Sequence, residues 1–351
     1  MDSSNHFSLL EMIEHPAFCV RDGNIIRSNK AAQQKLFLEG TSVANFLPKD
    51  VSAYRDFNGG CLYLNVTSSD VTSGATVTRI EDFDLFVLDT EDIKLEAYAL
   101  AALQLKTPLC SIVNMIEELA VGDRTYEESS SSLRQHIYQL SRLVSNMADA
   151  DWLRHESSAQ LETTDFSDFF AELMEKMETL IVSAGRHFEF QNLTESTIGL
   201  ADRDRLERAI SNILSNAVKF SPKDSIIRTR VTKKDSFLYF SVIDTGSCQD
   251  SRCRVFTNYL RPAGIEDSRH GLGLGMAIVH SVATDHGGTV LVDTPEEGGT
   301  RVTMSISLRQ PKRPILRSPT QLPKVDLVTG VDPAYVEFSD VLPASAFEVE
   351  K

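Results

Sequence analysis

The chain has 351 residues, of which 42% are hydrophobic and 24% are charged, a composition typical of a soluble globular protein. This length predicts two or three domains. The net charge of −15 and the absence of a long Lys/Arg run argue against nucleic acid or an anionic membrane surface as a partner.

The N-terminal segment MDSSNHFSLLEMIEHP has neither the basic region nor the long apolar core of a signal peptide. No stretch approaches the ~20 apolar residues that a membrane span requires. Five scattered cysteines favour free, mostly buried thiols in a reducing compartment. They are Cys19, Cys61, Cys110, Cys248 and Cys253. The sequence therefore predicts a cytoplasmic protein.

Residues 1–90 predict a small α+β domain. A helix, a strand, an Asp-Gly turn, a second strand and a helix follow one another, and two more strands come later. The predicted segments are a helix at 7–15, strands at 17–20 and 25–29, a helix from Lys30, and strands at 61–68 and 84–90. This order resembles the opening of a PAS sensor domain. A dimerisation or spacer domain without a ligand is the alternative.

Residues 91–156 predict two consecutive helices joined by a short turn. Apolar residues recur at alternating steps of three and four, which is a heptad seam. They are Leu95, Tyr98, Ala102, Leu105, Leu109, Ile112, Ile116 and Leu119, then Leu133, Ile137, Leu140, Val144 and Met147. One hairpin cannot bury this seam, whereas pairing with a second hairpin into a four-helix bundle can. A homodimer or a heterodimer with a related chain is therefore predicted.

Residues 160–309 alternate between helix and strand, which predicts an α/β sandwich. We expect helices at 165–184, 202–219 and 274–286, and strands at 187–192, 225–232, 237–244, 288–294 and 300–307. The whole chain is thus predicted to be a multidomain α+β protein. The segment 310–351 contains six of the twelve prolines and predicts an extended, flexible tail.

The third region begins its polar motifs with NILSNAVKFSP. Asn212 and Asn216 lie four residues apart, so both amides project from one helix face. Their oxygens suit Mg²⁺, and Lys219 can bind a phosphate. Two asparagines on a helix are also compatible with a polar surface or a helix cap.

Two glycine-containing segments and a strand end follow in the same region. In FSVIDTG, Asp244 and Gly246 end a strand, where a carboxylate can accept a hydrogen bond from an adenine amine or simply begin a turn. In HGLGLGMAIVH, three glycines precede a helix whose positive end can bind phosphate. A dinucleotide-binding fold would require G-x-G-x-x-G directly after a strand. Here the spacing is G-x-G-x-G and a polar loop precedes it, so that fold is not predicted. The segment EEGGTRVTMSI adds a glycine turn before the last strand.

In this order and spacing, these motifs resemble the ATP-binding domain of sensor histidine kinases, which shares its fold with gyrase and the Hsp90 chaperones. The resemblance covers residues 160–309 and implies a site for Mg²⁺ and ATP, with Asn212 and Asn216 as the metal ligands. It also implies that Phe256 anchors a lid over the nucleotide. The implied ATP-binding residues are Asn212, Asn216, Lys219, Asp244, Gly246, Gly271, Leu272, Gly273, Leu274, Gly275 and Thr300.

One residue departs from the family pattern. Family members usually read D-x-G-x-G after the strand, and here Cys248 replaces the second glycine. A side chain at that position can crowd the nucleotide or restrict φ. ATP binding remains the expectation, and tight binding is in question.

With this domain following it, the segment AALQLKTPL resembles the acceptor segment S-H-E-L-R-T-P-L of the same family. Thr107 and Pro108 are retained. Leu103 stands where the phosphate-accepting histidine belongs, and Gln104 stands where an acid would act as a base. A leucine cannot accept a phosphoryl group. His136 on the second helix is interpreted as a solvated or packed side chain.

Three functions follow from this pattern. The first is a pseudokinase of a two-component pathway that binds Mg-ATP and acts by conformational coupling, with a response regulator as a possible partner. The second is an enzyme that phosphorylates a partner protein in trans. The third is a sensor module whose degenerate kinase domain binds no nucleotide.

Overall fold

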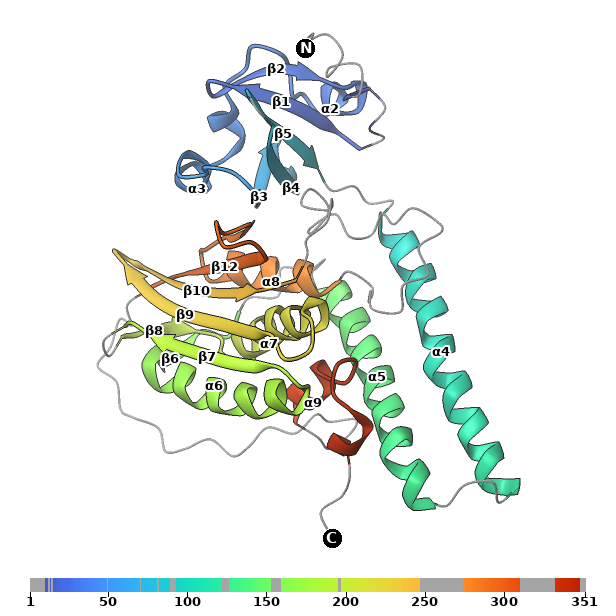
Figure 1. Cartoon of the computed structure of the whole chain (residues 1–351). Helices are drawn as coiled ribbons and strands as arrows, with labels where there is room; N and C mark the ends of the chain where they lie inside the picture. The colour runs from blue at the N-terminus through green and yellow to red at the C-terminus, as the bar shows by residue number, and fades with distance from the viewer. Residues whose placement is uncertain are drawn as a thin grey trace.

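The computed structural model describes residues 10–11, 13, 15–48, 50–69, 71–80, 82–88, 93–121, 126–152, 159–194, 197–246, 274–309 and 332–347. Figure 1 shows an N-terminal α+β domain, a long helical hairpin and a C-terminal domain of sheet and helices. The predicted α+β class is confirmed. No helix in these described ranges combines the length and the apolarity needed to cross a membrane.

The N-terminal domain is an antiparallel sheet with short helices. Its strands run in the order β2-β1-β5-β4-β3. Its core is aromatic, because the Phe18 ring stacks on Phe37 and on Phe86 with centroid distances of 4.8 Å each. The elements are β1 (Ala17–Arg21), β2 (Asn24–Ser28), α2 (Lys30–Gln34), η1 (Val43–Phe46), α3 (Val51–Arg55), β3 (Cys61–Ser68), β4 (Val71–Ile80) and β5 (Phe83–Leu88).

Most predicted elements of this domain form close to their expected positions. The helix expected at 7–15 lies mostly outside the described residues. Strand β4, VTSGATVTRI, and the short helices η1 and α3 were not predicted from the sequence, and β4 is the longest of them. Its first half contains Ser, Thr and Gly, which are typical of loops, and pairing with both β3 and β5 overrides this local preference.

The hairpin consists of α4 (Ile93–Val121) and α5 (Tyr126–Trp152). Pro108 lies inside α4, and the helix continues past it. Several apolar side chains of the predicted seam remain exposed to solvent in the single chain. They include Leu109 (49% exposed), Ile116 (54%), Ile137 (43%) and Val144 (54%).

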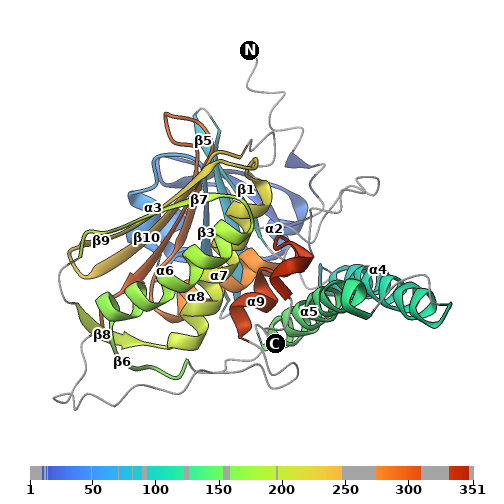
Figure 2. The ribbon, with the colours of Figure 1, turned by 60° about the horizontal axis from the view of Figure 1, so that its bottom comes forward.

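The C-terminal domain has helices on one face of a mixed sheet (Figures 1 and 2). Its strands follow the order β11-β12-β10-β9-β7, and β6 pairs with β8 in a separate small sheet. The elements are β6 (Glu162–Asp165), α6 (Phe166–Ser183), β7 (His187–Asn192), β8 (Ile198–Ala201), α7 (Arg203–Phe220), β9 (Ile226–Lys234), β10 (Phe237–Asp244), α8 (Leu274–Asp285), β11 (Val290–Asp293) and β12 (Thr300–Ser307). The expected helices and longer strands thus lie within about two residues of their predicted bounds.

The two sheets join into one of ten strands, because β3 of the N-terminal domain pairs antiparallel with β11. In this pairing Tyr63 lies opposite Val290, and Cys61 lies opposite Val292. The Tyr63 ring also lies 3.8 Å from the imidazole of His280 on α8, measured between centroids. Burial of His280 lowers its pKa to about 3, so the imidazole is neutral in this contact.

The C-terminal segment differs from the predicted flexible tail. Residues 332–347 fold into α9 (Pro333–Glu337) and η3 (Ala344–Phe347). Phe338 is fully buried and Phe347 is 4% exposed, so both belong to the main core. Their apolar anchors outweigh the proline content from which an extended tail was expected. The stretches 310–331 and 348–351 lie outside the described residues.

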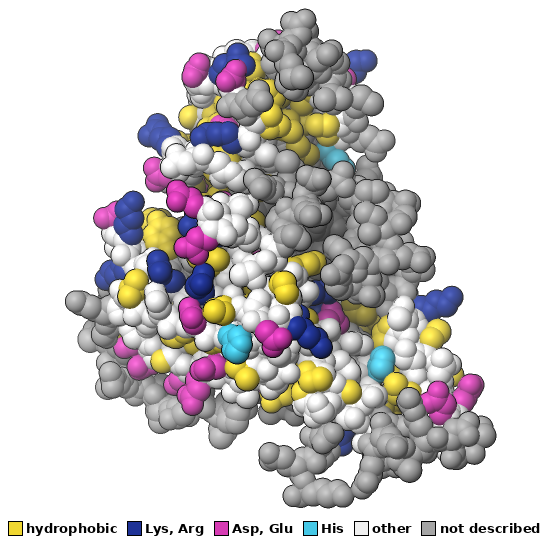
Figure 3. Space-filling view, viewed as in Figure 1, with side chains coloured by type: hydrophobic (Ala, Val, Ile, Leu, Met, Phe, Trp, Pro, Cys, Tyr) yellow, Lys and Arg dark blue, Asp and Glu magenta, His cyan; other side chains and the backbone are white. Residues whose placement is uncertain are grey.

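Charged side chains of both signs are interspersed on the face shown in Figure 3, over the sheet of the C-terminal domain. Ion pairs across neighbouring strands account for part of this pattern. Arg228, for example, lies 3.4 Å from Glu189 and 3.3 Å from Glu297.

Candidate nucleotide site

Helix α7 carries the polar residues expected to bind nucleotide, and it is one of the most buried helices of the domain. Asn212 is 1% exposed. Its Nδ2 donates to the Arg208 carbonyl oxygen at 3.0 Å, which fixes the orientation of the amide. The Oδ1 atom is buried and has no hydrogen-bond partner among the described residues. A buried acceptor without a partner costs stability, so this atom is available for a ligand.

The start of α8 lies directly against this amide. A Cβ atom added to Gly275 would lie 2.5 Å from Asn212 Oδ1. The glycine lets the start of α8 lie directly against the Asn212 side chain. The sequence-predicted pair Asn212 and Gly275, distant along the chain, is therefore brought together at the N-terminal end of α8, where backbone N–H groups favour anions.

Asn216 and Lys219 continue the same face of α7. Asn216 is half-buried. The Lys219 side chain is 7% exposed, and its Nζ lies 3.3 Å from Asp340 Oδ2 in the C-terminal segment. Burial lowers the pKa of Lys219, with Asp340 opposing the shift and Arg142 adding to it. Asp340 is thus the acidic partner of this amine.

Asp244 ends β10 and is 7% exposed. Burial raises the pKa of its carboxyl group to about 6, although backbone N–H groups of Gly246 and Thr300 donate to it and oppose the rise. The Gly246 N–H donates to Oδ1 at 2.7 Å. The carboxylate is thus held in one orientation at the sheet edge and can accept a further hydrogen bond.

Two glycines hold this aspartate close to α7. A Cβ atom on Gly246 would lie 2.7 Å from the Phe220 carbonyl oxygen at the end of α7. Gly299 has φ +84, and a Cβ there would collide with the Asp244 carbonyl oxygen. Thr300 lies opposite Asp244 in the β10–β12 ladder. The four predicted segments are therefore linked by pairwise contacts, with α7 contacting both the start of α8 and the end of β10.

A buried hydrogen-bond network, which was not predicted from the sequence, connects the start of α7 to the end of α8. Asp202 caps α7, accepting from the Arg205 N–H at 3.2 Å. The backbone N–H of Asp202 donates to His286 Nε2 at 2.9 Å, while His286 Nδ1 lies 2.7 Å from the Val282 carbonyl oxygen. Nε2 accepts, so Nδ1 carries the proton and the ring is neutral. Burial lowers the His286 pKa in agreement. In the sequence, the signal for this network is a histidine directly before Gly-Gly.

The remaining site predictions have different outcomes. Leu274 begins α8. Gly271, Leu272, Gly273, the lid residue Phe256 and Cys248 lie outside the described residues. In the acceptor segment, Leu103 and Gln104 lie within α4, Thr107 is exposed and Pro108 is buried.

Comparison with known families agrees with this geometry. Residues 201–310, which run from the start of α7 through β12, match the family described as histidine kinase-, DNA gyrase B- and HSP90-like ATPase. Residues 201–310 therefore carry a domain of this ATPase family. An ATPase domain of this kind implies ATP binding.

Related sensor kinases match a longer part of the chain. The sensor protein KdpD of Clostridium acetobutylicum is 28% identical over 211 residues, covering 56% of this chain and 22% of that protein. The sensor histidine kinase CusS of Escherichia coli K12 is 26% identical over 213 residues, covering 58% of this chain and 43% of that protein. The chain thus matches less than half the length of these relatives.

A solved structure of histidine kinase ThkA in complex with the response regulator protein TrrA is also similar to this kinase-like chain. The alignment covers 87% of the present chain and 99% of the ThkA chain, with 17% sequence identity and a TM-score of 0.48.

Proposed function

We propose that this protein is a regulatory member of the sensor histidine kinase family that binds Mg-ATP and does not phosphorylate its own hairpin. One observation carries the proposal. Helix α7 contacts α8 through Asn212 and Gly275 and contacts the end of β10 through Phe220 and Gly246, whereas Leu103 stands at the position predicted for the acceptor on α4. The nucleotide would act by changing conformation. Scattered cysteines support a reducing compartment, which makes the cytoplasm the proposed location.

The donor set fits a hard cation with phosphate oxygens. Asn212 offers the buried Oδ1 atom that has no partner among the described residues, and Asn216 lies one turn away on the same face. Amide oxygens are hard donors that Mg²⁺ accepts while it retains water and phosphate ligands. Bound Mg²⁺ would supply charge neutralisation to the phosphates. Asp244 would accept a hydrogen bond from the adenine amine, with Thr300 beside it.

The hairpin supports a dimer. Leu109, Ile116 and Val144 are each about half exposed, and they belong to the heptad seam. Exposed apolar seams of this length are stable when a second hairpin covers them. The proposed partner is therefore a second copy or a related kinase, with a response regulator as the downstream protein of the pathway.

The proposed PAS-like sensor can influence the ATP-binding domain through the shared sheet. Strand β3 pairs with β11, and β11 in turn pairs with β12, which carries Thr300. Buried Cys61 belongs to the core of the C-terminal domain. A rearrangement of the N-terminal domain would therefore alter the sheet that supports the nucleotide residues. This continuity favours conformational coupling over an independent spacer.

The test is incubation of purified protein with Mg-ATP labelled at the γ-phosphate. We expect the protein to bind nucleotide and to retain no acid-labile label. His136 is the one histidine of the described hairpin, and its Nδ1 lies 2.7 Å from the Ser132 carbonyl oxygen of its own helix. If label is retained in wild type and disappears in His136→Gln, His136 is the acceptor and the proposal is wrong.

The completeness of the nucleotide residues keeps a second function open, namely phosphorylation of a partner in trans. Asn212, Asp244 and Gly275 would bind ATP in the same way for transfer to a histidine of a partner kinase or to a Ser/Thr of a client. Mixing the protein with candidate partners and labelled ATP separates the two functions. Transfer of label to a partner would establish the enzyme.

Cys248, in place of a family glycine, favours the third function, a module that binds no nucleotide. Thermal unfolding tests it directly. A ligand at about 100 times its Kd should add about 2.7 kcal/mol to the free energy of unfolding. An unchanged melting temperature at millimolar Mg-ATP would favour the nucleotide-free module and remove the first two functions.

A further inference from the structure

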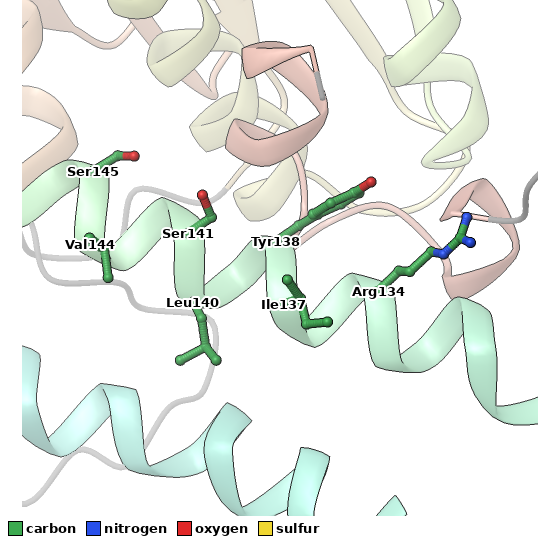
Figure 4. A pocket seen from close by; sticks show the side chains of 7 residues that line it. All are labelled: Arg134, Ile137, Tyr138, Leu140, Ser141, Val144 and Ser145. Carbon is green, nitrogen blue, oxygen red and sulfur yellow. The ribbon is translucent and has the colours of Figure 1, made fainter. Parts of the chain in front are cut away.

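The C-terminal strap, Asp332–Phe347, lies between the hairpin and the ATP-binding domain. Figures 1 and 2 show α9 between α5 and α7. Its apolar residues are anchored in the main core, with Ala334 1% and Phe338 0% exposed. The Phe347 ring lies 5.1 Å from the ring of Tyr138 on α5. Figure 4 shows Tyr138 on the side of α5 that faces the strap, while Leu140 points toward α4.

Hydrogen bonds to the strap backbone come from both sides. On α5, Gln135 Nε2 donates to the carbonyl oxygens of Ser339 at 3.1 Å and of Leu342 at 2.8 Å. On α7, the buried Ser215 hydroxyl donates to the Glu337 carbonyl oxygen at 3.1 Å. Side chains of two different domains thus satisfy carbonyl groups of one short segment. The strap fixes α5 relative to α7.

Four charged groups complete the contact. Arg142 of α5, 11% exposed at its side chain, lies 2.8 Å from Glu337 and also pairs with Asp340. Asp340 also contacts Lys219 of α7, with Nζ to Oδ2 at 3.3 Å. Burial raises the Asp340 pKa, but Arg142 and Lys219 outweigh it and hold that pKa below its ordinary value. The charges of the two cations and the two anions in this cluster therefore balance.

Lys219 stands on the ligand-binding face of α7. It follows Asn212 by seven residues and Asn216 by three, so all three side chains leave the helix on similar sides. We propose that the C-terminal strap competes with nucleotide phosphates for Lys219. In the protein without nucleotide, the Asp340 carboxylate forms an ion pair with the Lys219 ammonium group. This inference rests on the proposed function, because it requires Lys219 to bind phosphate.

The charge arrangement makes the exchange reversible. When phosphate takes Lys219, Asp340 keeps Arg142 as its partner and is not left as an unpaired buried charge. The strap would then be held by fewer contacts on α7, and α5 would be less tightly fixed to the ATP-binding domain. By linkage, whatever loosens the strap raises nucleotide affinity, and nucleotide loosens the strap to the same extent.

The experiment compares three full-length proteins: wild type, Asp340→Asn and the matched control Asp332→Asn. Asp332 lies on the same strap, but its ion pair is with Lys176 at 2.5 Å. We expect Asp340→Asn to lower the Kd for Mg-ATP about fivefold and to speed modification of Lys219 by an amine-selective acylating reagent about as much, as for a lost ion pair. Asp332→Asn should change neither.

The outcomes distinguish the competition for Lys219 from the Mg-ATP binding on which it depends. Equal Kd values and equal Lys219 modification in all three proteins would leave ATP binding intact and overturn the competition. Failure of all three to bind Mg-ATP would overturn the proposed function and the competition with it.

A second measurement requires no variant. In wild type, saturating Mg-ATP should accelerate hydrogen exchange of the strap amides, such as the Phe338 N–H bonded to Ala334 and the Leu342 N–H bonded to Phe338. Exchange that is unchanged or slower while nucleotide is bound would contradict the inference. This result decides the matter even if Asp340→Asn does not fold.

Discussion

Helices α7 and α4 carry different kinds of side chain at the positions for which the sequence predicts the nucleotide site and the phosphate acceptor. On α7 a buried amide, Asn212, is retained within an apolar core, where an acceptor without a partner costs about 1–3 kcal/mol of stability. On α4, Leu103 stands at the position predicted for the phosphate acceptor. The unpartnered amide oxygen supports the proposed nucleotide ligand, and Leu103 supports the proposed absence of an acceptor on the same chain.

The largest effect is expected when a phosphate acceptor is placed on α4. Leu103→His with Gln104→Glu should retain acid-labile label from γ-labelled Mg-ATP, where wild type retains none, because only the nucleophile and its base are absent. Leu109→His, on the same helix and half exposed, is the control. Equal labelling of both variants would mean that position 103 has no special relation to the nucleotide site.

The second effect weakens the proposed nucleotide site. Asp244→Asn replaces an acceptor-only group with one that presents N–H donors, so it should raise the Kd for Mg-ATP about 10- to 100-fold in a calorimetric titration. Asp293→Asn is the control, because Asp293 lies on β11, two strands from Asp244, and pairs with Arg301 on β12. A similar loss in both variants would indicate damage to the sheet and not a specific adenine contact.

A smaller effect concerns the surface that α4 exposes. Ile116→Lys places a charge on the predicted seam and should convert a dimer to a monomer in light-scattering measurements, since a charged residue at this position opposes burial. Val182→Lys on α6 has a similar starting exposure of 55%, lies outside the hairpin, and should leave the mass unchanged. A dimeric Ile116→Lys variant would place the subunit contact elsewhere.

Periodicity alone predicted most of the C-terminal domain. The helices α6, α7 and α8 and the strands β7, β9, β10 and β12 combine a regular apolar pattern with clear ends, such as Asp202 before α7. The convergence of Asn212 and Gly275 was predicted only through the family resemblance, because no local pattern relates two residues in separate helices.

The C-terminal strap escaped prediction for a different reason. Its elements are short, and their stability comes from burial of Phe338 and Phe347 against two other domains. The signal of Asp332 followed by Pro333, a helix cap and a first-turn proline, was present in the sequence. The pairing of β3 with β11 left no local signal at all, because any exposed strand edge can accept another strand.

The smallest expected effect tests whether Asp244 is as buried as its surroundings indicate. Its folded pKa of about 6 lies above the ordinary value of 3.8, so the folded state holds the proton more tightly than the unfolded state. The stability that this proton contributes is complete below pH 4 and is lost as the pH rises through 6.

Relative to Asp244→Asn, wild type should therefore lose about 2 kcal/mol of unfolding free energy between pH 4 and pH 7, at about 1.4 kcal/mol per pKa unit. Paired denaturation curves without nucleotide measure this difference, and other titrating groups cancel because both proteins share them. A flat difference would mean that water reaches the carboxylate. In that case the pocket edge is open, and the adenine contact would be made at a hydrated surface where it contributes less to binding than a buried one.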